Sequence, residues 1–87
     1  MKKVKLDSGL TLSVKDDVMD NMELLDDLVE LDEGNGFAIS RVLNRILEPD
    51  EKKKLYDHLR ENGVTKVSKV VDAMKEIFDK LGDNGKN

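Results

Sequence analysis

Residues 16–33 contain nine acidic side chains and no basic one, and this stretch constrains the fold more than any other part of the chain. Clustered carboxylates repel one another and belong at a surface in contact with water. The apolar residues between them recur at helical spacing and form two neighbouring stripes. The first stripe is Val18, Met22, Leu25 and Val29, and the second is Leu24, Leu28 and Leu31. The pattern predicts an acidic helix over residues 16–32 with a broad apolar face, ended by Gly34-Asn35-Gly36.

Residues 2–15 precede this helix and have a different periodicity. Their apolar residues occupy even positions from Val4 to Val14, which is the spacing of a half-buried strand pair. Asp7-Ser8-Gly9 lies between the two runs and has the composition of a tight turn. The segment therefore predicts a β-hairpin over residues 2–15 whose apolar face rests on the helices that follow.

Apolar residues at helical spacing predict three further helices, over residues 37–47, 49–62 and 65–81. Pro49 separates the first two, because the residue before a proline avoids the helical conformation. Gly63 is expected to cap the third helix, Gly82 to end the fourth, and residues 83–87 to form a frayed tail. The expected fold is mainly α (α+β), a single domain over residues 1–87 with an N-terminal β-hairpin followed by four short helices around one core.

Composition and charge exclude several classes of function. The chain has 87 residues, a net charge of −4 and no cysteine. It has no apolar run near the ~20 residues that a membrane span needs. Its basic residues, Arg41, Arg45, Lys52-Lys53-Lys54 and Arg60 among them, alternate with acids and predict solvated helix surfaces. Nucleic acid and membrane are therefore not expected as partners, because phosphate binding depends on clustered bases.

No catalytic or metal-binding pattern is present in the sequence. His58 is the only histidine, and without a cysteine or a second histidine it predicts no metal shell. None of the serines lies in a nucleophile-elbow sequence. The carboxylates of the acidic helix share similar exposed environments, whereas acid–base catalysis needs carboxyl groups with different pKa values. We expect no catalytic residue, no cofactor and no metal, and a protein that is not an enzyme.

The acidic helix is the candidate site of recognition. Like charges at i,i+4 spacing destabilise a helix, and scattered lysines would have removed that repulsion. One apolar stripe suffices for a small core, so the second stripe together with its acidic neighbours predicts an interface. The predicted partner-binding residues are Asp20, Glu23, Leu24, Asp27, Leu28, Glu30 and Leu31. The alternative is that the hairpin and the last helix cover both stripes.

The order of segments resembles a known family. A lysine-rich hairpin with a D-S-G turn leads into the acidic L-L-D-D-L-V-E-L helix, and A-I-S-R-V-L-N-R-I-L then precedes the proline. K-K-L-Y-D-H-L-R-E-N-G and a V-x-x-V-V-x-x-M-x-x-I-F helix follow. This order, over about residues 2–81, resembles the small tail assembly chaperones of long-tailed (siphophage-type) bacteriophages and prophages.

The resemblance implies a non-enzymatic, self-associating protein that binds and shields the tape-measure protein during tail tube assembly. It further implies a location in the cytoplasm of the bacterial host, absence from the mature virion, and a longer second product made by frameshifting. A second hypothesis is a small acidic phage-type inhibitor, or nucleic-acid mimic, that binds a basic protein partner. A third is a structural domain whose surface is merely acidic.

Overall fold

The N-terminal segment folds as the predicted β-hairpin. The computed structural model describes the backbone of residues 1–85 and the side chains of residues 1–82. Strands β1 (Lys2–Lys5) and β2 (Thr11–Val14) pair antiparallel, with Val4 opposite Leu12. Gly9 in the turn has a φ of 104°, which side chains other than glycine rarely adopt. The alternation seen in the sequence buries Val4, Leu12 and Val14 on one face.

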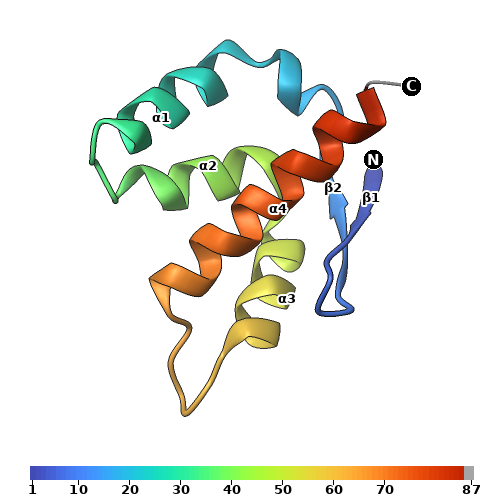
Figure 1. The fold of residues 1–87 in the computed structure, drawn as a ribbon, viewed down its shortest axis with the longest axis vertical. Coiled ribbons are helices and arrows are strands. Elements are labelled where there is room, and N and C mark those ends of the chain that lie inside the picture. The colour runs from blue at the N-terminus through green and yellow to red at the C-terminus, as the bar shows by residue number, and fades with distance from the viewer. Residues whose placement is uncertain (86–87) are drawn as a thin grey trace.

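Four α-helices follow the hairpin, which confirms the predicted fold class (Figure 1). They are α1 (Met22–Asp32), α2 (Ala38–Ile46), α3 (Pro49–Leu59) and α4 (Val67–Gly85). Pro49 is the first residue of α3, where its missing N–H is no loss because the first turn of a helix has no acceptor for it. None of these helices, within residues 1–85, is long and apolar enough to cross a membrane.

Helix α1 begins at Met22 instead of the predicted Asp16. Asp17 has a left-handed backbone with a φ of 58°, which a right-handed helix cannot include. A single 3-10 turn, η1 (Val18–Asp20), follows, and Asn21 is extended. The Asn21 side chain then accepts a hydrogen bond of 3.2 Å from the Leu24 N–H and caps α1. A cap of this kind satisfies one of the free N–H groups of the first turn, so it sets where the helix starts.

Helix α3 and helix α4 also end at residues other than those predicted. Asn62 and Gly63 both have positive φ, and Glu61 and Val64 exchange two backbone hydrogen bonds of 2.9 and 3.0 Å. This geometry is a tight hairpin-type turn, for which Asn-Gly is a preferred pair. Gly63 is therefore not the cap of α3, which ends at Leu59. Helix α4 continues through Gly82 to Gly85, so the predicted frayed tail is wrong for residues 83–85, and residues 86 and 87 lie outside the described residues.

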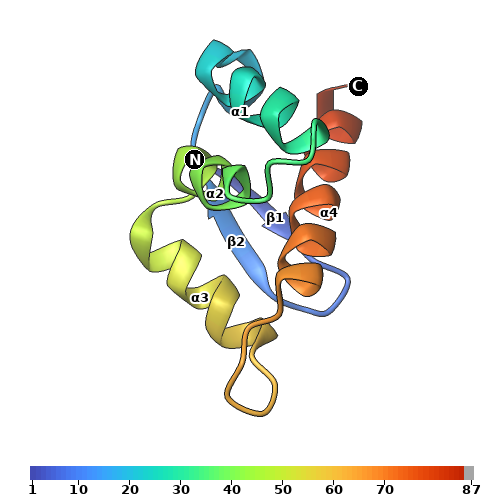
Figure 2. The same cartoon turned by 90° about the vertical axis from the view of Figure 1, so that its left-hand side faces the viewer.

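One cluster of buried side chains joins the hairpin to all four helices. The hairpin lies between α3 and α4, with β2 against α3 and β1 against α4 (Figure 2). Glu51 on α3 accepts a hydrogen bond of 2.5 Å from the Ser13 N–H, and Glu76 on α4 accepts one of 2.5 Å from the Asp7 N–H. The first of these carboxylates satisfies a backbone N–H at the edge of the two-stranded sheet, and the second satisfies one in the turn between the strands. The hairpin is thereby fixed to the helices on both sides.

Candidate partner-binding surface

The two apolar stripes of α1 have the opposite roles to those predicted. Leu24 is only 2% exposed, and Leu28 and Leu31 pack against the core. Leu25, at 51% exposed, instead lies on the outer face of α1 together with Met22 and Val29. This contradicts the prediction that Leu24, Leu28 and Leu31 form an exposed stripe, because Leu24 is buried and Leu28 and Leu31 are only partly exposed. They are the residues that attach α1 to the rest of the molecule.

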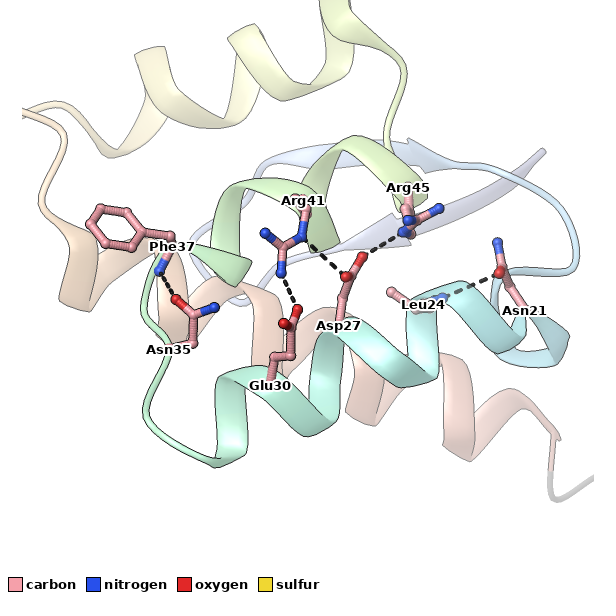
Figure 3. Close-up of polar contacts among 8 residues, drawn as sticks. All are labelled: Asn21, Leu24, Asp27, Glu30, Asn35, Phe37, Arg41 and Arg45. Atoms are coloured by element: carbon pink, nitrogen blue, oxygen red, sulfur yellow. Dashed lines mark hydrogen bonds and ion pairs between the residues drawn. The ribbon is translucent and has the colours of Figure 1, made fainter.

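Asp27 explains why this stripe faces inward. It lies on the same side of α1 as Leu24 and Leu28 and is 5% exposed. Its Oδ1 is 3.1 Å from Arg41 Nε and its Oδ2 is 2.5 Å from Arg45 Nε, both on α2 (Figure 3). Arg41 also pairs with Glu30 through its Nη2. Asp27 and Glu30 were predicted to contact a partner, and the structure places both in ion pairs within the chain.

This ion-pair cluster has a clear electrostatic effect. The hydrogen bond from Arg45 is the main reason that the pKa of Asp27 lies below its ordinary value, and Arg41 lowers it further. The hydrogen bond to Asp27 in turn raises the pKa of Arg41. Turning α1 about its axis to bury the Met22 stripe would take Asp27 away from both arginines. The ion pairs form only when Asp27 faces α2, so the cluster favours the observed orientation.

The outer face of α1 and the adjoining 3-10 turn form a continuous apolar surface of the exposed side chains Met19, Met22, Leu25 and Val29. Because carboxylates of the acidic segment surround it, we call this apolar surface the acidic strip. Beside it is a hollow of about 270 Å³, where Val18, Leu24 and Leu28 form the floor between the exposed residues. Single exposed apolar residues are ordinary, whereas a contiguous group marks an interaction site. Methionines suit such a site because their flexible side chains adapt to different partners.

Most carboxylates of the acidic segment surround this strip without internal partners. Eight of the nine are exposed, and six of these eight form no ion pair within the described part of the chain. They are Asp17, Asp20, Glu23, Asp26, Asp32 and Glu33. Of the predicted partner-binding residues, Asp20 and Glu23 are therefore the two that remain both exposed and unpaired. Their charges are available to a partner that carries bases.

The structure also brings together one pair of residues that the sequence did not connect. Ser8 Oγ in the hairpin turn lies 2.9 Å from His58 Nε2 on α3, a spacing that resembles a nucleophile and its base. Both side chains are exposed, and among the described residues the other ring nitrogen of His58 has no hydrogen-bond partner. Such a pair lacks the third group that orients a catalytic histidine. Within residues 1–82, no group of three His, Asp or Glu side chains is arranged to hold a metal ion.

Two features of the sequence could have indicated where α1 begins and which bases face it. Asn21 stands three residues before Leu24, at the spacing of a helix cap, and would have placed the start of α1 at Met22. Arg41 and Arg45 stand four residues apart, so they lie on one side of a helix and can both reach a single carboxylate. Which of the nine carboxylates they bind could not be read from spacing alone.

Comparison with protein-family models, with curated proteins and with solved structures finds no match for this chain. Its function therefore has to be inferred from the surface itself and from the order of segments in the sequence.

Proposed function

We propose that this protein is a non-enzymatic binding protein that shields an apolar helical segment of another chain. The observation that carries the proposal is the acidic strip, in which Met19, Met22, Leu25 and Val29 are exposed side by side and unpaired carboxylates surround them. Combined with the resemblance in segment order, it supports the role of a tail assembly chaperone for a tape-measure protein. The same resemblance supports a location in the bacterial host cytoplasm and absence from the finished virion.

The chemistry of the strip defines the partner that it fits. An amphipathic helix can lay its apolar face over Leu25 and Val29 and enter the hollow beside them. Lysines or arginines on the flanks of that helix would meet Glu23, Asp26 and their neighbours. Apolar burial supplies most of the affinity, while the charge pairs set orientation and speed association. Many copies on one long client would add their individually weak contacts through multivalency.

A matched pair of valine substitutions tests the proposed surface. Val29 on α1 is 49% exposed and Val67 at the start of α4 is 66% exposed, so Val29→Asp and Val67→Asp should both leave the fold intact. The client for this test is the tape-measure protein, which the resemblance implies is encoded just downstream, and binding is measured by titration calorimetry. Val29→Asp is expected to weaken binding about tenfold or more, because it loses apolar burial and adds a repelled charge. Val67→Asp lies outside the acidic strip and should bind the client no more weakly than the unmodified protein does.

Two results would contradict this proposal. Equal binding by Val29→Asp and the unmodified protein would remove α1 from the client site. Absence of a long helical reading frame downstream of the gene, with no overlapping frame for a longer product, would remove the chaperone role. Either result can be obtained without knowing which client segment binds.

The six unpaired carboxylates also favour the second candidate, an acidic inhibitor of a basic protein. A partner held mainly by charge would lose affinity steeply as salt rises, and Val29→Asp would then leave binding unchanged or strengthen it. A client held by apolar burial would keep its affinity at moderate salt. Titrations of the same two variants at low and at moderate salt therefore separate the two functions.

A further inference from the structure

A second exposed apolar surface lies away from the acidic strip. Phe37 at the start of α2 is 88% exposed, an unusual exposure for an aromatic side chain, and Val64 and Val67 are exposed beside α4. Phe37 and Val67 border a hollow of about 250 Å³ whose walls include Ile39, Tyr56 and Val70. We call Phe37, Val67 and this hollow the Phe37 surface. It can accept apolar side chains from another molecule.

The charges beside the Phe37 surface are positive. Lys52 Nζ donates hydrogen bonds to Ser40 Oγ at 3.1 Å and to Asn44 Oδ1 at 2.8 Å, and it lies 5.6 Å from the centroid of the Tyr56 ring. All three of these partners are neutral. Lys66 is exposed next to Val67, and no ion pair joins either lysine to an acid among the described side chains. Glu61, the acid of the adjacent turn, lines a different hollow with His58 and Lys69.

We infer that the Phe37 surface binds the acidic strip of a second copy of this chain. Eight large apolar side chains are exposed among the described residues, and all except Met1 and Val64 belong to one of these two surfaces. One surface has unpaired carboxylates around it and the other has unpaired lysines. Two oppositely charged apolar surfaces on one molecule can therefore cover each other between copies.

The interface is head-to-tail, because each copy contributes a different surface to each of its two neighbours. A symmetric contact between two Phe37 surfaces would place Lys52 and Lys66 of one copy near those of the other. A symmetric contact between two acidic strips would bring the carboxylates together. Like charges held close at an interface are unfavourable, so the mixed contact is selected.

The competition described next rests on the proposed function, in which the acidic strip binds the client. The acidic strip would then serve both a neighbouring copy and the client, so the two occupants compete. Self-association then covers the strip while the client is absent, and client binding releases the copies. The exposed apolar surface of α1 is in this way protected from unspecific contacts.

Two exposed residues provide the test. Leu25→Glu removes the acidic strip and leaves the Phe37 surface, whereas Phe37→Ser does the reverse. Sedimentation velocity should show concentration-dependent association of the unmodified protein, which weakens as salt rises. Each variant alone should remain a monomer, with association weakened about tenfold or more. An equimolar mixture of the two variants should form a heterodimer and nothing larger, because only one intact pair of surfaces remains.

Three results would overturn the inference. These are a monomeric unmodified protein at every concentration, self-association of either variant alone, or a mixture of the variants that stays monomeric. Lys75→Ser changes an exposed residue of α4 outside both surfaces and should associate as the unmodified protein does. Circular dichroism of each variant confirms that the fold is retained.

A peptide probe separates this inference from the proposed function. The probe is a synthetic amphipathic helix with leucines along one face and lysines on both flanks. Phe37→Ser should bind it and Leu25→Glu should not, and an excess of it should dissociate the unmodified protein into monomers. If the variant mixture dimerises but the unmodified protein ignores the probe, the proposed function fails and the head-to-tail contact stands. If the probe binds without dissociating the copies, the competition is wrong.

Discussion

Helices α1 and α4 are both amphipathic, yet only α4 buries most of the apolar stripe that its sequence predicts, with Val67 at its start left exposed. Its buried residues are Val70, Ala73, Met74, Ile77 and Leu81. Helix α4 has a single apolar stripe, so one orientation satisfies it. Helix α1 has two adjacent stripes, and either one could face the core. The difference shows that a broad apolar face makes a helix easy to recognise in a sequence and hard to orient.

The two helices also differ in where the partners of their charged side chains lie. Acids and bases alternate along α4, and Lys80 pairs with Glu76 on its own helix at 3.0 Å and with Asp7 of the hairpin at 3.0 Å. Helix α1 has no base of its own, so its internal ion pairs must come from elsewhere in the fold. Arg41 and Arg45 of α2 supply them to Asp27 and Glu30. The orientation of α1 therefore depends on a neighbouring helix, whereas the charges of α4 are balanced along the helix itself.

Truncations of buried side chains should show the largest effect, and they test directly which stripe of α1 is buried. Leu24→Ala on α1 and Ile77→Ala on α4 should each lower the free energy of unfolding by about 2–5 kcal/mol, because both side chains are buried. Leu25→Ala should change it by no more than about 0.5 kcal/mol, as expected for an exposed position. Urea denaturation measures all three. A larger loss for Leu25→Ala than for Leu24→Ala would mean that the predicted orientation of α1 was right after all.

Asp27→Asn should have a smaller effect that depends on pH. The pKa of Asp27 is lowered from its ordinary value of 3.8, so the ionised side chain stabilises the folded state. That contribution is present above pH 3.8 and is lost as the pH falls through the lower pKa of the folded state. Asp27→Asn should therefore unfold at a lower temperature than the unmodified protein at neutral pH. The difference between the two should shrink as the pH falls below 3.8.

Asp26→Asn is the matched control for this measurement, because Asp26 is its exposed neighbour and makes no ion pair among the described residues. It should leave the thermal midpoint nearly unchanged at neutral pH. A gap between Asp27→Asn and the unmodified protein that persists unchanged into acid would show that the carboxylate charge is not what holds α1 to α2.

Removing the cap of α1 should have the smallest effect of the three. Asn21→Ala loses the hydrogen bond from the Leu24 N–H and should lower the free energy of unfolding by about 1 kcal/mol. Asn21→Asp keeps an acceptor oxygen at the same place and should retain most of the stability. Urea denaturation of the two variants gives the comparison. Equal losses for both would show that the start of α1 is set by packing and not by the cap.

Much of the fold could be predicted from local patterns. The hairpin follows from the alternation of Val4, Leu12 and their neighbours, and α2 begins and ends within one residue of its predicted range. The errors lie at helix ends. Asp17 and Asn62 adopt left-handed backbone conformations that no periodicity reveals. The proposed surface lies on the helix that was predicted to bind a partner but on its other side, since Leu24 and Asp27 are buried and Leu25 is exposed.

The sequence by itself determined that the acidic segment, residues 16–33, contains a helix with more apolar surface than one core contact needs. Spacing and composition are local properties, and they decide which segments become helices and how wide their apolar faces are. Only the tertiary structure decided which stripe of that helix would be left exposed. The reason is physical: two stripes of similar apolarity differ little in the free energy of burial, so the ion pairs of Asp27 with Arg41 and Arg45, between residues distant in sequence, select one orientation.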